Sequence, residues 1–140
     1  MNDTLTRDEV IEAQSQWGAG VVAADPEALL ALYDFSELVF KPTMSPSIRT
    51  DAAGARSYFV GGDVNYPGDK GFLHNGFVAV DFDSARGPVI ARDGLTAHDM
   101  GHYTFTQPDG TEVFADYSFA YRKVDGQVRI TLHHSSYNVG

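Results

Sequence analysis

Regular alternation of apolar and polar side chains in the C-terminal third of the chain most restricts how this sequence can fold. From Val113 onward, every second residue is apolar or aromatic, which is the pattern of a strand with one face in a core. The turn-forming pairs Asp109-Gly110 and Asp125-Gly126 separate this strand from its two neighbours and indicate hairpins. Successive strands joined by hairpins predict an antiparallel sheet. The expected strands are 73–80, 89–91, 95–105, 113–122 and 127–135.

Helical signals occupy the N-terminal part of the chain. Thr6 and Glu9 have the spacing of a capping box, and apolar residues then recur at helical intervals. Asp25 followed by Pro26 is typical of the cap and first turn of a second helix. Helices that precede an antiparallel sheet predict an α+β domain with the helices on one face of the sheet. The other elements expected here are a short strand at 38–40 and a third helix at 51–60.

Composition is that of a single globular domain. The 140 residues fit one domain, taken as 1–140, and hydrophobic residues make up 43%, which is enough for a core. The absence of cysteine excludes disulfides, thiolate metal sites and cysteine nucleophiles. A formal net charge of -9 argues against nucleic acid and against anionic membrane surfaces as partners, because both select basic patches.

The N-terminal residues give an expectation about location. They lack the basic region and apolar run of a secretory signal. The chain also contains no stretch of the ~20 apolar residues that a membrane helix needs. We therefore expect a cytoplasmic protein.

One face of the predicted sheet changes from apolar to polar along its strands. Ile130 and Leu132 share a phase in the last strand, and continuing that phase places His134 and Ser136 on the same side. Two-residue turns would bring polar groups of the neighbouring strands beside them. A mostly apolar surface with a few convergent polar groups predicts a small-molecule site. The expected cross-strand pairs are Tyr121 with Ile130, Phe119 with Leu132, Tyr117 with His134, and His102 with Tyr117.

The histidines also admit a purely structural interpretation, since a buried histidine on a core strand is commonly a hydrogen-bonded core residue. As metal ligands they are poorly spaced. His98 and His102 would lie ~13 Å apart on a strand that rises ~3.3 Å per residue, whereas zinc needs ligands at about 2.0–2.1 Å from one point. His133 and His134 point to opposite faces. We therefore expect no metal and no other cofactor, with a site assembled from distant strands as the open alternative.

Six short segments carry a pattern that occurs, in the same order, in a known family. They are Phe-Lys-Pro-Thr at 40–43, Ser-Tyr-Phe-Val-Gly-Gly-Asp at 57–63, Asp-Lys-Gly-Phe at 69–72, Met-Gly-His-Tyr-Thr-Phe-Thr at 100–106, Asp-Tyr-Ser-Phe-Ala-Tyr at 116–121 and Leu-His-His-Ser-Ser at 132–136. The ordered set resembles the iota-class carbonic anhydrases. The final His-His-Ser-Ser also resembles relatives of the calcium/calmodulin-dependent kinase association domain, which has the nuclear-transport-factor-2-like cone fold.

The resemblance implies a fold, an activity and a site. The fold is a cone in which N-terminal helices pack on a curved antiparallel or mixed β-sheet. The activity is reversible hydration of CO2 to bicarbonate. The family is described both as metal-free and as metal-assisted, so our expectation of no metal rests on the histidine spacing and the absence of cysteine. In the family, a Thr after Lys-Pro, a Tyr before Phe-Val, and a His and a Ser of the terminal motif line the pocket. They match Thr43, Tyr58, His134 and Ser136.

Roles for these residues follow from their chemistry. The hydroxyls of Thr43, Tyr58 and Ser136 are expected to hold bicarbonate oxygens. His134 is expected to act as general base or proton shuttle, because a histidine has an ordinary pKa near neutrality. The substrate-binding face would also include Tyr117 and His102, where His102 replaces an asparagine of the family.

Two other functions stay open: another cone-fold enzyme or binder of a larger organic molecule, and a non-catalytic association domain. A sheet covered by helices on one side leaves its other side exposed. We therefore expect a homodimer through the sheet face opposite the pocket. That face would carry Asp116, Ser118, Arg129, Thr131 and His133.

Overall fold

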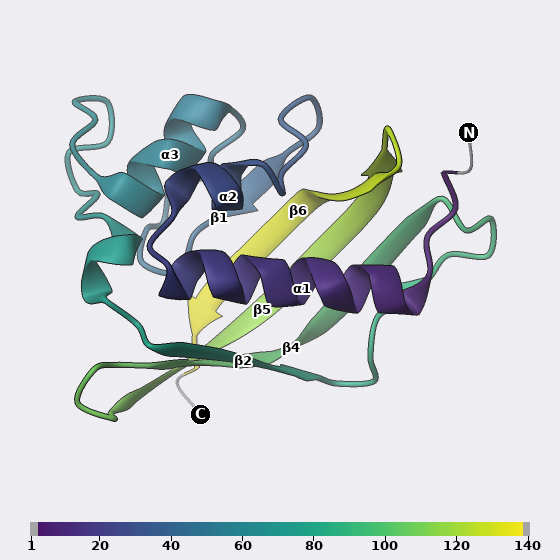
Figure 1. Ribbon diagram of the computed structural model, residues 1–140. Helices are drawn as coiled ribbons and strands as arrows, with labels where there is room; N and C mark the ends of the chain where they lie inside the picture. Colours follow the sequence, from purple (N-terminus) through teal and green to yellow (C-terminus); the bar gives the residue numbers. More distant parts are fainter. Residues whose placement is uncertain (1–2, 139–140) are drawn as a thin grey trace.

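The computed structural model describes residues 3–138 and confirms an α+β architecture with helices on one face of a mixed sheet (Figure 1). The capping box at Thr6 and Glu9 is present, with the Thr6 backbone N–H donating to the Glu9 carboxylate at 2.9 Å. Asp25 caps the second helix and Asp51 the third. The helices are α1 (Arg7–Val22), α2 (Pro26–Leu30) and α3 (Ala52–Val60), with a 3-10 turn at Phe72–Asn75.

The sheet runs in the order β1-β6-β5-β4-β2, with β3 also paired to β4. β1 lies parallel to β6, and the other pairs are antiparallel, so the sheet is mixed. The strand expected at 73–80 is wrong, because its first half forms the 3-10 turn and the strand begins only at Ala79. The strands are β1 (Val39–Lys41), β2 (Ala79–Ser84), β3 (Val89–Ile90), β4 (Thr96–Thr106), β5 (Glu112–Val124) and β6 (Gln127–Tyr137).

The core lies between α1 and the sheet, which α1 crosses along its length (Figure 1). Trp17 projects from α1 into this core and is 2% exposed. Its ring centroid lies 5.7 Å from that of Tyr103 on β4 and 5.7 Å from that of His133 on β6. Aromatic rings therefore fill most of the cone, and polar groups among them need partners within the core.

A bulge in β6 reverses which side of the sheet its last residues face. The two-residue turn at 125–126 pairs Tyr121 with Ile130, as expected, but Ala120 then pairs with Leu132 and leaves Thr131 as an extra residue. The bulge falls where β6 changes its other neighbour, from a bridge between Tyr33 and Ile130 to the ladder with β1. Beyond Thr131, the residues predicted to face solvent therefore face the core.

The pairs expected beyond the bulge are therefore wrong by one residue. Phe119 lies opposite His133, and Tyr117 lies opposite Ser135. The expected pair of His102 with Tyr117 is also wrong, because the turn that contains Pro108 spans 107–111 and places His102 opposite Asp116. The core-facing phase predicted for β5 itself is confirmed, since its alternate residues from Ala115 to Tyr121 are buried.

The opposite face of the sheet is exposed and carries several large apolar residues. Leu132 on β6 is 40% exposed and Met100 on β4 is 64% exposed. The prediction that His133 lies on this face is wrong, because the bulge turns His133 into the core, where it is 2% exposed. Within residues 3–138, no helix is long and apolar enough to cross a bilayer.

Candidate functional site

Three hydroxyl groups meet where β1, α3 and the end of β6 come together. Thr43 follows β1 after Pro42, Tyr58 lies on α3, and Ser135 lies on β6 beyond the bulge. The Thr43 and Ser135 hydroxyls are hydrogen-bonded to each other. The Tyr58 hydroxyl is buried beside the Thr43 hydroxyl and the Met44 backbone, but it has no well-aligned hydrogen-bond partner among residues 3–138. A buried hydroxyl without a partner is costly unless a ligand or water completes it, so this group marks a binding position.

Behind these hydroxyls, a chain of hydrogen bonds runs back through the core to α1. The Trp17 indole N–H donates to the Tyr33 hydroxyl at 3.0 Å. The Tyr33 hydroxyl lies 2.9 Å from Nδ1 of His133, and the Tyr103 hydroxyl lies 3.2 Å from Nε2 of the same ring. The Tyr103 hydroxyl donates to Ser135. We refer to this series, from Trp17 through Tyr33, His133, Tyr103 and Ser135 to Thr43, as the relay.

The relay has one direction. Because Tyr103 gives its only proton to Ser135, its oxygen must accept from Nε2–H of His133. Nδ1 of His133 is then bare and accepts from Tyr33, whose oxygen accepts from the donor-only indole of Trp17. Either hydroxyl can donate in the bond between Ser135 and Thr43. The donors from Trp17 to Tyr103 therefore point toward the site, and one O–H, of Ser135 or of Thr43, remains to donate to a ligand.

Burial sets the protonation of these groups. Removal from water and, second to it, the neighbouring His134 lower the pKa of His133 to about 3. Burial raises the pKa of Tyr58 well above its ordinary value, against the opposing effect of the Thr43 hydroxyl. Burial likewise raises the pKa of Tyr103, although its bond to Ser135 opposes the shift. The imidazole and both phenols are therefore neutral at physiological pH, and the site binds by hydrogen bonds from neutral groups.

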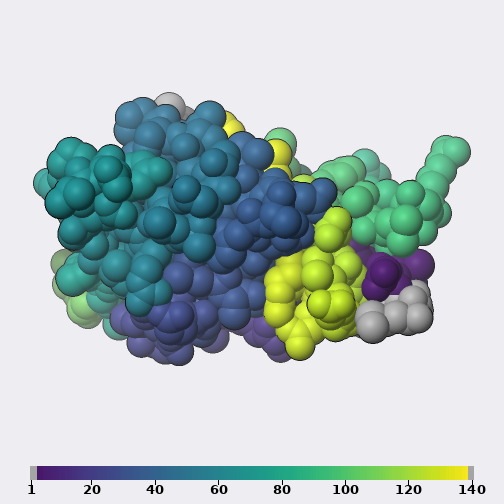
Figure 2. Space-filling model, turned by 90° about the horizontal axis from the view of Figure 1, so that it is seen from above, coloured from purple at the N-terminus to yellow at the C-terminus, as the bar shows by residue number. Residues whose placement is uncertain are grey.

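Two adjoining cavities lead to the hydroxyls from the surface. A cavity of about 330 Å³ is lined by Tyr58, and a smaller one of about 130 Å³ by Thr43. They share Met44, Phe72 and Asn75, so they are neighbours on either side of these residues. In the space-filling view, the teal segment around 60–75 forms this end of the molecule, opposite the yellow-green β5–β6 turn (Figure 2). A small, partly apolar space lined by hydroxyls suits a small, weakly polar molecule.

The structure brings together some of the residues predicted for the site and separates others. Thr43 and Tyr58 lie together as expected. His134 and Ser136 do not join them, because the bulge places both on the exposed face of the sheet. The prediction that these two residues face the core is wrong. His133 and Ser135, each one position earlier in the sequence, face the core instead, and Ser135 is the one hydrogen-bonded to Thr43.

Tyr117 and His102 also lie away from the hydroxyls. Tyr117 is buried, but its hydroxyl bonds to Asp99 and Ser84 at the other end of the core. His102 is exposed on the opposite face, where Nδ1 lies 2.6 Å from the Asp116 carboxylate. Neither residue lines the two cavities beside Thr43 and Tyr58.

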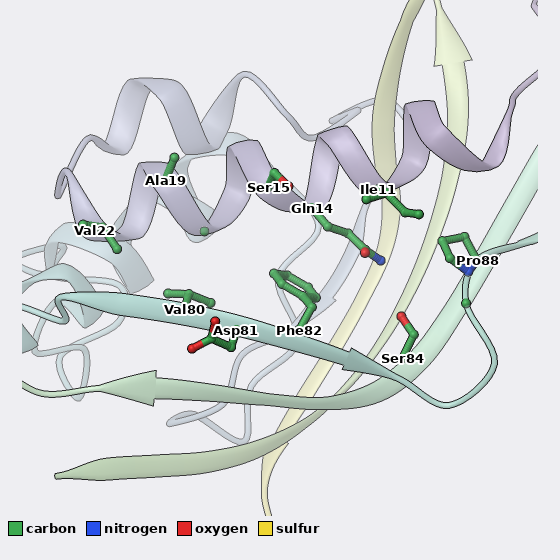
Figure 3. Close-up of a pocket in the computed structure, with 12 residues that line it drawn as sticks. Ile11, Gln14, Ser15, Ala19, Val22, Val80, Asp81, Phe82, Ser84 and Pro88 are labelled. Carbon is green, nitrogen blue, oxygen red and sulfur yellow. The ribbon is translucent and has the colours of Figure 1, made fainter. Parts of the chain in front are cut away.

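A separate groove of about 650 Å³ lies between α1 and the edge strand β2. Gln14 and Ser84 point into it from the two elements (Figure 3). Both donate to the buried carboxylate of Asp99, at 2.7 Å and 2.6 Å, and Tyr117 donates to the same oxygen. These hydrogen bonds satisfy the buried carboxylate from within the chain, so the cluster has a structural role: it joins α1 to the sheet.

Nothing in the described part of the chain, residues 3–138, groups three His, Asp or Glu side chains in a way that could hold a metal ion. The five groups that sequence reasoning missed are Trp17, Tyr33, Tyr103, His133 and Ser135. The terminal His-His-Ser-Ser motif contains two of them, but the strand phase selected the wrong member of each pair.

A family model described as metal-independent carbonic anhydrase matches residues 27–137. A curated relative, the metal-independent carbonic anhydrase of Nostoc sp. (strain PCC 7120 / SAG 25.82 / UTEX 2576), is 35% identical over an alignment 157 positions long, and the match covers 97% of this chain and 75% of the relative.

Solved structures show the same likeness in three dimensions. The crystal structure of a cyanobacterial iota-carbonic anhydrase complexed with bicarbonate has a TM-score of 0.87 and 32% identity, and the match covers 100% of this chain and 96% of that chain. A putative calcium/calmodulin-dependent protein kinase II association domain from Xanthomonas campestris has a TM-score of 0.75 and 26% identity, covering 99% and 96%. An NTF2-like protein from Shewanella oneidensis, at 15% identity and a TM-score of 0.69, shares the fold alone and confirms the expected cone. The matched family model covers most of the chain, and the chain belongs to the metal-independent carbonic anhydrase family.

Proposed function

We propose that this chain catalyses the reversible hydration of CO2 at the hydroxyls of Thr43, Tyr58 and Ser135. The observation that carries the proposal is the buried Tyr58 hydroxyl, which lacks a well-aligned partner, beside the donor end of the relay. The structural relative described as complexed with bicarbonate gives the ligand class. Bicarbonate is a small oxyanion, and its oxygens can accept the O–H groups that this site leaves free.

In the hydration direction, a water oxygen forms a bond to the carbon of CO2, an O–H bond of that water breaks, and negative charge develops on the CO2 oxygens. Thr43 and Tyr58 present neutral O–H donors to these oxygens. Donors fixed in place before the reaction stabilise such developing charge without reorganising, which is commonly the largest catalytic contribution. The neighbouring apolar wall, which includes Phe72, suits uncharged CO2.

The relay supports the donors rather than supplying a base. With a pKa near 3, His133 stays neutral, and both its nitrogens are occupied by tyrosine hydroxyls. We propose that His133 orients Tyr103, which orients Ser135 and through it Thr43. His134 and Ser136, on the other face of the sheet, have no part in this arrangement.

The direct test is CO2 hydration by the purified protein. We expect stopped-flow traces to exceed the buffer background across pH 6.5–9 (a range we choose) and to do so after treatment with a chelator, because the groups proposed to act are hydroxyls. Metal content is measured on the same sample by mass spectrometry. Traces that overlay the control without enzyme would refute the activity. Loss of activity on chelation, restored by one equivalent of zinc or manganese, would refute its independence of metal.

We also propose that the chain forms a homodimer through the exposed face of the sheet and acts in the cytoplasm. Four large apolar side chains support the first point, because exposed apolar groups on one sheet face favour association. They are Val39, Met100, Phe114 and Leu132. Sedimentation at micromolar concentration should give twice the mass of the chain, and Leu132→Lys should shift the measured mass toward that of a single chain. A wild-type protein of single-chain mass would contradict the proposal.

A further inference from the structure

Hydration of CO2 releases a proton, and the interior of the site has no group that can take it. The relay donors from Trp17 to Tyr103 point toward the substrate, so a water there accepts from the free O–H of Ser135 or Thr43 and cannot pass its proton back to His133. The pKa of His133, lowered by burial to about 3, also keeps this ring from holding a proton at neutral pH. The acceptor must therefore lie on the solvent side, in the cavity beside Tyr58.

Three ionisable side chains besides Tyr58 line that cavity: Asp69, Lys70 and His74. Asp69 is occupied, since it accepts two bonds of 2.8 Å from Arg49 and one of 2.6 Å from Ser57. A lysine ammonium carries only donors and has no free lone pair. An imidazole is the side chain that both accepts and releases protons near neutral pH.

The His74 ring is held at this cavity and still reaches solvent. It projects from the 3-10 turn, is exposed, and lies so close to Gly71 that a Cβ there would meet its Cδ2 at 2.3 Å. Its Nε2 lies 3.2 Å from the carbonyl oxygen of Val60, at the end of the helix that carries Tyr58. With Nε2–H donating to that carbonyl, Nδ1 is left as the proton acceptor.

We infer that His74 is the proton-transfer residue of this enzyme, carrying the proton between water in the cavity and the surrounding buffer. In hydration, the attacking water forms its bond to carbon and its proton passes, through cavity water, to Nδ1 of His74. The imidazolium then returns the proton to a buffer base, which balances the reaction as CO2 plus water giving bicarbonate and a proton. This inference rests on the proposed function.

The test is His74→Ala, with His98→Ala as the matched control, because His98 is an exposed histidine on β4 that lines neither cavity. At low buffer concentration we expect kcat for His74→Ala to fall by roughly 10-fold, less than the ~10²–10⁴-fold of a direct general base, because water still reaches the cavity. The ratio kcat/KM should stay close to wild type, since the carbon–oxygen bond forms before the proton leaves the cavity. Added imidazole should restore kcat, and His98→Ala should behave as wild type throughout.

The outcomes separate this inference from the proposed function. An inactive wild-type protein would refute the proposed function, and the inference with it. An active wild type with an unchanged kcat for His74→Ala at low buffer would overturn the role of His74 alone. A fall in kcat that imidazole does not restore, or a parallel fall in kcat/KM, would overturn it as well, because it would show that His74 supports the structure of the cavity.

Discussion

Ser135→Ala is expected to lower kcat/KM for CO2 hydration on the order of 10²-fold, the effect of losing one preorganised donor to a developing oxyanion. Ser135 joins Tyr103 to Thr43, so its removal breaks the relay beside the substrate. Without its bond to Ser135, the Thr43 hydroxyl loses the constraint that holds it toward the ligand. The measurement is initial-rate stopped-flow hydration, with thermal unfolding to show that the variant is folded.

Ser136→Ala is the matched control for this experiment. Ser136 is the next residue on the same strand and has the same side chain, but it lies on the opposite face of the sheet. Its replacement should leave kcat/KM within about twofold of wild type, as surface substitutions away from a site are usually mild. If Ser136→Ala were inactive while Ser135→Ala kept full activity, the site would lie on the exposed face and the assignment made here would be wrong.

The difference between these two serines shows where strand periodicity stops being informative. Alternation predicted the faces of β5 correctly, because that strand is regular from Ala115 to Tyr121. In β6 the same reasoning failed after Ile130, since one extra residue, Thr131, shifts every later side chain to the other face. The cause is the change of neighbour from Tyr33 to β1, a contact between distant segments that local pattern does not contain.

Local chemistry predicted the helices well, because their signals are local. Thr6, Asp25 and Asp51 each accept a bond from a backbone N–H of the first turn. Thr43 and Tyr58 came from the family resemblance and lie together in the structure. The core partners of the site could not be inferred in this way. Trp17 and Tyr103 have the pattern of ordinary core residues, and only the tertiary packing shows that their polar atoms belong to the relay.

The loop that carries part of the cavity wall is tied down by one buried ion pair. Arg49 is 1% exposed, donates to both carboxylate oxygens of Asp69 at 2.8 Å, and stacks over Tyr66 at 4.0 Å. It also donates to the carbonyl oxygen of Gly54 in α3. A two-pronged pair of this kind fixes the loop against the helix that carries Tyr58.

Arg49→Met is therefore expected to reduce the free energy of unfolding by about 3–5 kcal/mol, because it leaves the buried Asp69 carboxylate without its counter-charge. For a domain of this size the melting temperature should fall by roughly 10–20 °C. The control is Arg56→Met, which removes an arginine whose ion pair with Glu27 is exposed. Such a pair contributes about 0–1 kcal/mol, so its loss should move the melting temperature little.

The effect of pH distinguishes loss of the ion pair from loss of packing. Burial works to raise the pKa of Asp69, but the bonds from Arg49 and Ser57 outweigh it and hold the pKa below its ordinary value. A lowered carboxyl pKa stabilises the wild type fully above the unfolded-state pKa, and this contribution is lost as pH falls through the folded-state pKa. In Arg49→Met the buried Asp69 carboxylate has no counter-charge, so protonation relieves the destabilisation. The difference in free energy of unfolding between the two proteins should therefore narrow as pH falls toward and below about 4. A gap that stays constant between pH 7 and acid, or a melting temperature unchanged at pH 7, would show that this pair does not hold the loop.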